Sequence, residues 1–339
     1  MAELPGVDIE ALTRWLDRER PGIRTGELSG QVIAGGKSNL TYRISDGSST
    51  WALRRPPLAH VLPTAHDMAR EYTVMSALGG TAVPVPQTIA LCTDRDVLGA
   101  TFYLMSFVDG VVLDRPEAIA KLTQELAGST CDQLVDTLVV LHDVDPTSVG
   151  LSEFGRPAGF LARQVKRWTQ QWQANETEQR ETLPALLDKL AGTMPEQSRA
   201  GIVHGDYRLT NVMYQPDLSG IAAVVDWEMA TLGDPLTDVG LLVVYQTLSA
   251  DDDGVMPRMS PADGFPTADE MVARYARSSD RDLSDLDWYV AFGYFKLAVI
   301  SEGIHNRYLQ GKTVGDGFSH FGNSVPRLLD TALLTLSAR

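Results

Sequence analysis

The feature that most constrains the fold is the stretch of residues 201–226, in which short apolar runs alternate with polar loops. Residues 201–203 have the character of a buried strand that leads into a polar loop. The apolar pattern resumes over residues 211–214, turn-forming residues follow at 216–220, and a β-branched run occupies 221–225. The pattern predicts a hairpin over 211–225 that presents polar side chains from the ends of its strands.

The polar side chains of this stretch have an informative order. His204-Gly205-Asp206 is followed by Asn211 and then, after the second strand, by Asp226. Magnesium-dependent phosphoryl transfer from ATP needs one carboxylate that orients and deprotonates the attacking hydroxyl, and hard oxygen ligands that hold Mg²⁺. Asp206 fits the first role, and Asn211 and Asp226 fit the second. Unrelated loop residues are the alternative, which the fixed order on a strand, loop and hairpin disfavours.

With these motifs the chain resembles the aminoglycoside phosphotransferase and choline kinase-like family, whose small-molecule kinases share the protein-kinase architecture. The likeness continues in Asp226-Trp227-Glu228 and in Gly233-Asp234-Pro235 with Asp238. It implies an α+β, protein-kinase-like two-lobed fold, with a small β-rich N-lobe at residues 1–108 and a larger, mainly helical C-lobe at 109–339. We expect Asp234 and Asp238 to cap a helix and brace the catalytic loop.

The resemblance also implies a nucleotide clamp in the N-terminal part. Residues 32–44 read as strand, Gly-rich turn and strand, with Gly35, Gly36 and Ser38 in the turn. Glycines let backbone N–H groups approach phosphate oxygens, and Ser38 or Asn39 could add side-chain donors. A glycine pair taken alone is more typical of an ordinary hairpin, but its position ahead of the catalytic loop favours a phosphate-binding turn.

The strand that follows supplies a small residue and a cation on one face. Period-two alternation places Ala52 and Arg54 together, with Ala52 over the base and Arg54 near the phosphates. Family members commonly have lysine at the place of Arg54, and arginine is not interchangeable with lysine. Glu71, on a helix expected from about Ala65 to Leu78, is the candidate ion-pair partner of Arg54. A solvated position on that helix is the alternative.

The apolar run of residues 104–108 resembles the hinge between lobes. Backbone groups around Ser106 and Val108 are therefore expected to bind adenine. A core strand explains the same residues almost as well, and only the following Asp109-Gly110 turn and the order of motifs favour the hinge.

The acceptor is less constrained than the nucleotide. The Leu-Arg-Arg-Pro-Pro run at 53–57 resembles the branch related to kinase domains fused to acyl-CoA dehydrogenases, which implies a hydroxyacyl-CoA-type acceptor. Residues 288–311 combine aromatics with Lys296 and Arg307, which suits apolar and anionic groups better than an aminoglycoside. Burial in a long helix is the stronger interpretation of the aromatics. Arg208, inside the catalytic loop, is a better candidate for contacting phosphate or acceptor.

Charge and cysteine content limit which binding partners and which cellular compartment are expected. The net charge of −15 argues against nucleic-acid and anionic-membrane partners. Cys92 and Cys131 lie in unrelated segments, which suggests neither a disulfide framework nor a zinc site and favours a reducing cytoplasm. The acidic N-terminus is unlike a signal peptide, and no apolar run is long enough to span a bilayer. Residues 8–20 predict a helix, and residues 250–266 predict a surface loop.

These observations predict an ATP- and Mg²⁺-dependent phosphotransferase that moves the γ-phosphate to a hydroxyl of a small molecule. Two alternatives are an aminoglycoside O-phosphotransferase and a nucleotide-binding module without catalysis, for which Arg54 would be the sign of drift. A protein kinase is disfavoured because no Ala-Pro-Glu segment follows Asp226. No pattern in the sequence indicates an oligomeric state.

Overall fold

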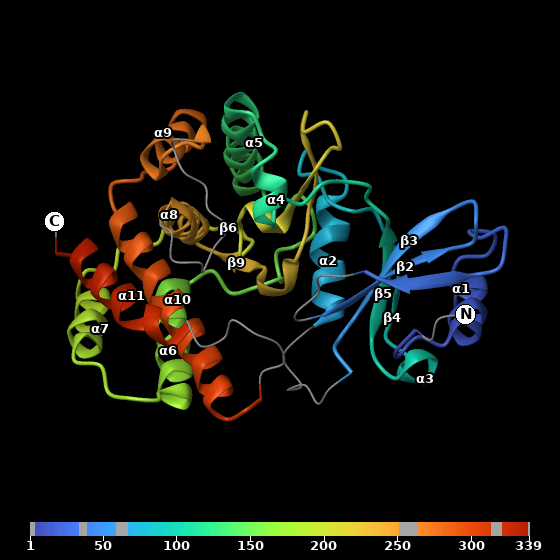
Figure 1. Ribbon diagram of the computed structural model, residues 1–339, viewed down its shortest axis with the longest axis horizontal. Coiled ribbons are helices and arrows are strands. Elements are labelled where there is room, and N and C mark those ends of the chain that lie inside the picture. The colour runs from blue at the N-terminus through green and yellow to red at the C-terminus, as the bar shows by residue number, and fades with distance from the viewer. Residues whose placement is uncertain (1–3, 34–38, 59–66, 251–262, 313–320, 338–339) are drawn as a thin grey trace. The chain divides into compact units, whose positions relative to one another are not determined.

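The computed structural model describes residues 4–33, 39–58, 67–250, 263–312 and 321–337 (Figure 1). The chain divides into two compact units, one formed by Met1–Val111 with Val212–Ala230 and the other by Val112–Asn211 with Thr231–Arg339. The hairpin segment thus groups with the N-terminal part. The lobe boundary after residue 108 stays a prediction.

The first unit is built on an antiparallel sheet of five strands in the order β1-β2-β3-β5-β4. The strands are β1 (Ser29–Val32), β2 (Leu40–Ser45), β3 (Thr50–Arg55), β4 (Thr88–Cys92) and β5 (Phe102–Ser106). The register pairs Arg54 of β3 with Thr41 of β2 and with Tyr103 of β5. Because side chains alternate along a strand, this register decides which residues share a face.

Helices cover the two faces of this sheet (Figure 1). On one face, α1 (Ile9–Glu19) packs Leu12, Trp15 and Leu16 into a core with Leu53 and Phe102. The rings of Trp15 and Phe102 meet edge to face at 4.8 Å between centroids. The other face carries α2 (Met68–Leu78), while α3 (Arg95–Leu98) follows β4. The helix expected over 8–20 is therefore confirmed, and the expected start of the second helix near Ala65 lies outside the described residues.

The predicted hairpin is present in the first unit. It consists of β7 (Val212–Tyr214) and β8 (Ile221–Val224), which pair antiparallel. Backbone bonds tie it to the N-terminal part, because Val111 bridges to Tyr214 and the Val224 N–H donates to the Pro84 carbonyl at 2.8 Å. A 3₁₀ helix over Trp227–Met229 follows Asp226.

The second unit is mainly helical, as expected for the larger lobe. Its helices are α4 (Pro116–Ile119), α5 (Gln124–Asp143), α6 (Phe160–Asn175), α7 (Thr182–Gly192), α8 (Leu236–Ala250), α9 (Ala268–Ser278), α10 (Leu286–Leu309) and α11 (Phe321–Thr335). One small ladder pairs β6 (Gly201–Val203) with β9 (Thr231–Gly233). Of the surface loop expected at 250–266, residues 251–262 lie outside the described part.

The central helix of this unit is α10, which packs against α6, α7, α8 and α11. Its aromatic residues Trp288, Tyr289, Phe292 and Phe295 are buried. These four aromatics are core residues, which confirms for them the stronger interpretation, burial in a long helix. In the described part of the chain, no helix has the length and apolar character that a bilayer crossing requires.

Candidate active site

The loop after β6 is held by the side chain of Asp238, which lies in the first turn of α8. Its two carboxylate oxygens accept hydrogen bonds from the backbone N–H groups of His204, at 2.7 Å, and Gly205, at 2.8 Å. The His204 ring in turn accepts a bond from the Asp206 N–H at 3.3 Å. Gly205 has a φ of 85°, a conformation that disfavours side chains. The expected bracing of the loop by Asp238 is therefore confirmed.

Asp238 itself is fixed by a buried histidine, His142. His142 Nε2 lies 3.4 Å from Asp238 Oδ2, and His142 Nδ1 lies 2.8 Å from the Tyr275 hydroxyl. Burial lowers the pKa of His142 despite the hydrogen bond to Asp238. A neutral ring that donates from Nε2 to Asp238 and accepts at Nδ1 from Tyr275 satisfies all three groups. Burial would raise the pKa of Asp238, but His142 and the loop lower it below its ordinary value.

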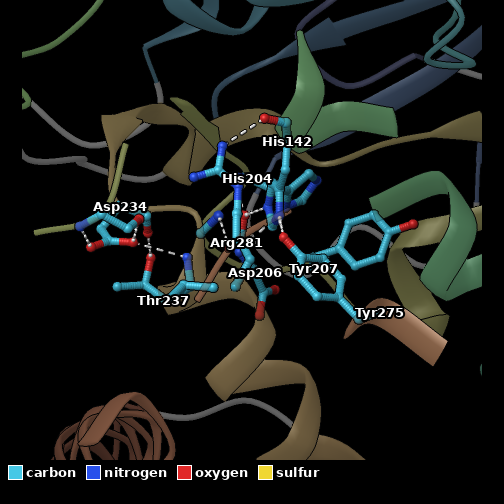
Figure 2. Close-up of polar contacts among 12 residues, drawn as sticks. His142, His204, Asp206, Tyr207, Asp234, Thr237, Tyr275 and Arg281 are labelled. Carbon is cyan, nitrogen blue, oxygen red and sulfur yellow. Dashed lines mark hydrogen bonds and ion pairs between the residues drawn. The ribbon is translucent and has the colours of Figure 1, made fainter. Parts of the chain in front are cut away.

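Asp234 has the second expected role, that of a helix cap. Its Oδ1 accepts from the Leu236 N–H at 3.1 Å, at the start of α8. The Tyr289 hydroxyl and the Ser198 N–H donate to the other oxygen, at 2.8 and 2.9 Å. Thr237 adds a hydroxyl bond to the Asp234 carbonyl (Figure 2). The bond from Leu236 satisfies a donor that a helix start otherwise leaves unpaired, and the others hold the Asp234 side chain and backbone in place.

Both carboxylate oxygens of Asp206 have partners. Oδ2 accepts from the Asn211 amide at 2.8 Å and lies 3.4 Å from Arg208 Nε. Oδ1 accepts from the Tyr245 hydroxyl at 2.5 Å. The side chain of Asp206 is 25% exposed, so it is anchored but remains open to solvent. A carboxylate with this combination of fixed orientation and access suits a general base.

Asn211 is oriented by the same contact. Its amide nitrogen donates to Asp206 Oδ2 and to the Asp206 carbonyl, both at 2.8 Å. Because the nitrogen is used for these bonds, the amide oxygen is the group that remains for a cation. A carboxamide oxygen is a hard donor of the kind that Mg²⁺ accepts. The chemistry of Asn211 therefore fits the ligand role predicted from the sequence.

Lys296 lies elsewhere than the sequence led us to expect. It is buried on α10, where Nζ donates to the Gly205 carbonyl and lies 5.5 Å from the centroid of the Trp168 ring. Burial lowers its pKa, although Asp206 and Asp238 oppose that shift. Lys296 thus holds a backbone carbonyl of the catalytic loop. Arg307, the other cation suggested for the acceptor, is exposed near the end of α10.

The first unit contains the expected ion pair and extends it. Arg54 Nε lies 3.0 Å from Glu71 Oε2, and Arg54 Nη2 lies 2.6 Å from Asp226 Oδ1. The Tyr103 hydroxyl donates to Glu71 Oε2 at 2.9 Å. Arg54 therefore connects the α2 carboxylate to the candidate metal ligand, with a separate nitrogen for each.

Burial and neighbouring charges act in opposite directions on the pKa values of this cluster. Burial raises the pKa of Glu71 to about 7, against the effect of Arg54 and the Tyr103 hydroxyl. Burial alone would lower the pKa of Arg54, but Glu71 and Asp226 raise it above its ordinary value. Asn39 donates to the carboxylates of Glu71 and Glu228, at 3.2 Å each. Its amide nitrogen thus points to acidic groups within the unit.

Asp226 has an unusual backbone conformation. Its φ of 67° and ψ of 57° lie in the left-handed region, which aspartate tolerates better than most residues with a side chain. Such conformations cost free energy and tend to occur at functional sites. This is consistent with a carboxylate whose direction is set by the backbone.

The structure describes only some of the other residues that are expected to contact the nucleotide. Ala52 is buried in β3 opposite Met105. Ser106 ends β5, and it exchanges hydrogen bonds with the backbone of Gln87 through its N–H and its hydroxyl, at 2.7 and 2.9 Å. Its carbonyl and the groups of Val108 are the better candidates for adenine. Gly35, Gly36 and Ser38 lie outside the described residues, so the phosphate-binding turn stays a prediction.

Three residues that support the site were not identified from the sequence. Tyr245 follows Asp238 by seven residues and lies on the same face of α8. This spacing is a signal that could have identified Tyr245 from the sequence. Tyr103 lies opposite Arg54 across β3 and β5, a relationship that depends on strand register. His142 has no local sequence pattern that connects it with Asp238.

Comparison with known proteins adds a family relationship. The sequence model of the phosphotransferase enzyme family matches residues 29–282. Acyl-CoA dehydrogenase family member 11 of Rattus norvegicus is 31% identical over 336 residues, which cover 96% of this chain and 43% of that protein. The chain thus spans less than half the length of this relative.

Solved structures show the same fold. A crystal structure from Ralstonia eutropha JMP134, provisionally described as an aminoglycoside phosphotransferase, has a TM-score of 0.86 and 31% identity, and 98% of each chain is covered. A thermostable mutant of an aminoglycoside phosphotransferase, in a ternary complex with AMP-PNP and hygromycin B, has a TM-score of 0.62 and 14% identity. The match covers 96% of this chain and 98% of the other.

Proposed function

Since the chain belongs to the phosphotransferase enzyme family, it is a small-molecule phosphotransferase, and we propose that it transfers the γ-phosphate of ATP to a hydroxyl with the help of Mg²⁺. The observation that carries the proposal is the arrangement around Asp206. A partly exposed carboxylate is held there by Asn211 and Tyr245, on a loop that Asp238 fixes. Asp206 would orient the acceptor hydroxyl and take its proton during in-line attack.

The nucleotide side of the proposal combines the motifs of the first unit with those of the catalytic loop. Asn211 and Asp226 would hold Mg²⁺, which neutralises charge on the phosphates when bound. Arg54, anchored by Glu71, would contact the phosphates, and Arg208 would contact phosphate or acceptor. The remaining nucleotide contacts would come from Gly35, Gly36, Ser38, Ala52, Ser106 and Val108. A protein of the same fold binds AMP-PNP, which supports ATP as donor.

For the acceptor, we favour a hydroxyacyl-CoA-type molecule. The support is the similarity to an acyl-CoA dehydrogenase family member over 96% of this chain. An aminoglycoside is the alternative, supported by the provisional description of the Ralstonia eutropha structure. Lys296 is buried and its ammonium donates to the Gly205 carbonyl, so this cation is already engaged within the protein. An anionic acceptor would therefore be recognised by other groups, with Arg208 as the first candidate.

The test is a coupled ADP-release assay with ATP, Mg²⁺ and three acceptor panels: hydroxyacyl-CoA thioesters, aminoglycosides, and choline-like compounds or sugar alcohols. In Asp206→Asn, we expect acceptor-dependent release to fall about a thousandfold, since general-base catalysis contributes on that order. Nucleotide affinity should change little. The matched control is Asp217→Asn, which changes an exposed aspartate in the turn between β7 and β8 and should leave turnover intact.

The outcomes separate the alternatives. Full activity of Asp206→Asn would refute the assignment of the base. Absence of acceptor-dependent release across all panels, with ATP still bound, would shift support to a nucleotide-binding module without catalysis.

A further inference from the structure

The Tyr245 hydroxyl donates a hydrogen bond to Asp206 Oδ1 at 2.5 Å. This is the carboxylate that the proposed function assigns as general base, and the short distance is typical of a bond to a charged acceptor. The other oxygen, Oδ2, is engaged by Asn211 and lies near Arg208. Oδ1 is therefore the oxygen that remains for an incoming hydroxyl, and a hydroxyl of the protein already contacts it.

The position of Tyr245 follows from the attachment of α8 to the catalytic loop. Asp238 in the first turn of α8 binds the backbone of His204 and Gly205. Tyr245 is seven residues further, which is two helical turns, so it projects from the same face toward the same loop. One helix thus contacts the loop twice, first through a carboxylate and then through a phenol.

Two further observations concern the position of the Tyr245 ring and the protonation of its hydroxyl. The Arg208 guanidinium lies 5.2 Å from the centroid of the Tyr245 ring, which holds the ring beside Asp206. Burial, and then the charge of Asp206, raises the pKa of Tyr245 well above its ordinary value. The hydroxyl therefore stays protonated and acts as a donor.

We propose that the Tyr245 hydroxyl occupies the hydrogen-bonding position on Asp206 that the acceptor hydroxyl takes during transfer, and thereby limits hydrolysis of ATP when no acceptor is bound. The inference rests on the proposed function. An acceptor has binding energy from its other groups with which to displace the tyrosine hydroxyl. A water molecule has no such energy, so water is a poor competitor for Oδ1.

The reaction that Tyr245 limits is ordinary hydrolysis. The water oxygen forms a bond to the γ-phosphorus, the bond between that phosphorus and the β,γ-bridging oxygen breaks, and ADP leaves with the bond electrons. One water proton passes to Asp206 Oδ1 and then to solvent, and the products are ADP and inorganic phosphate. Limiting such side reactions is a common task of an active site before the substrate is in place.

The experiment measures phosphate release from ATP and Mg²⁺ without acceptor, so it does not require the acceptor to be known. In Tyr245→Phe, we expect the rate to rise about tenfold, the order expected when one hydrogen bond to a charged group is lost. Tyr245→Leu should raise it as well, because it also lacks the hydroxyl. The double variant Tyr245→Phe with Asp206→Asn should lose the increase.

The matched control is Tyr42→Phe, which removes a buried tyrosine hydroxyl that donates to the Pro5 carbonyl in the first unit. It should leave the hydrolysis rate unchanged. Affinity for a fluorescent ATP analogue and the melting temperature of each variant show whether fold and nucleotide binding are retained.

Two results would overturn the inference: a hydrolysis rate in both folded Tyr245 variants no higher than in the parent, or an increase that survives in the double variant. A different result would refute the proposed function, namely acceptor-dependent transfer that is retained in the single variant Asp206→Asn. The two failures are therefore distinguishable.

Discussion

Each of the two units contains a cluster of polar side chains, and the two clusters are built from different kinds of contact. The Arg54 cluster of the first unit (Arg54, Glu71, Tyr103, Asn39 and Asp226) consists of side chains that contact other side chains. In the Asp206 cluster of the second unit (Asp206, Asn211, Tyr245, Asp238 and Lys296), side chains also hold backbone groups of one loop.

This difference bears on what each cluster tolerates. An ion-pair cluster depends on the number and geometry of its charges, so a change of protonation or of charge geometry should affect it. A loop held by carboxylates and an ammonium depends on acceptors and donors at fixed points, so loss of one contact should leave backbone groups unpaired. The three predictions that follow test this distinction, beginning with the largest expected effect.

The largest effect is expected for Asp238→Asn in the Asp206 cluster. Asparagine has one oxygen for the two N–H groups of His204 and Gly205, and its own N–H₂ then faces a buried donor. We expect the free energy of unfolding to fall by roughly 3 kcal/mol, with a parallel loss of turnover. Urea denaturation and the ADP-release assay measure the two effects. Asp217→Asn, on the surface, should change stability by less than about 0.5 kcal/mol; an equally small change in Asp238→Asn would contradict the bracing role.

An intermediate effect is expected from the titration of Glu71. Its pKa is about 7 in the folded protein against an ordinary value of 4.5. The folded state therefore holds this proton more tightly, and the resulting stabilisation is complete below pH 4.5 and is lost as the pH rises to about 7. Relative to Glu71→Gln, the parent should lose roughly 2–3 kcal/mol of unfolding free energy across that window.

Denaturation curves of both proteins between pH 5 and pH 8 test this, because groups common to both cancel in the difference. A difference in stability that does not change with pH would show that Glu71 is ionised throughout. In that case, the pair with Arg54 outweighs burial.

The smallest effect is expected for Arg54→Lys. Arginine contacts Glu71 with Nε and Asp226 with Nη2, whereas lysine has a single ammonium for both carboxylates. We expect kcat/KM for ATP to fall about tenfold, with Arg18→Lys on the exposed face of α1 as a silent control. A rise in kcat/KM would instead indicate that Arg54 had drifted from a more active lysine.

Residues that belong to short motifs could be predicted from the sequence. Asp206 and Asn211 share one loop, and the Arg54–Glu71 pair requires only a strand followed by a helix. Tyr103 could not be predicted, because it reaches Glu71 only through the register of β3 and β5. Such registers depend on strand pairing across the sheet, which local patterns do not determine.

The outcome for Lys296 has a similar cause. A cation in an aromatic segment suggested contact with the acceptor, but α10 has no distinct polar face and is packed on several sides. The lysine is therefore buried and satisfied by a carbonyl. Likewise, the direction of Tyr245 depends on where α8 begins, which Asp234 and Asp238 fix through contacts distant in the sequence.

The division of the chain has a practical consequence for protein engineering. Val212–Ala230 belongs to the first unit, although the residues before and after it belong to the second. The backbone therefore passes from one unit to the other at three points, after residues 111, 211 and 230. No single truncation yields either unit whole, and an N-terminal fragment that stops near residue 111 would lack the hairpin and Asp226. An isolated first unit would instead need residues 212–230 joined to it by a designed linker.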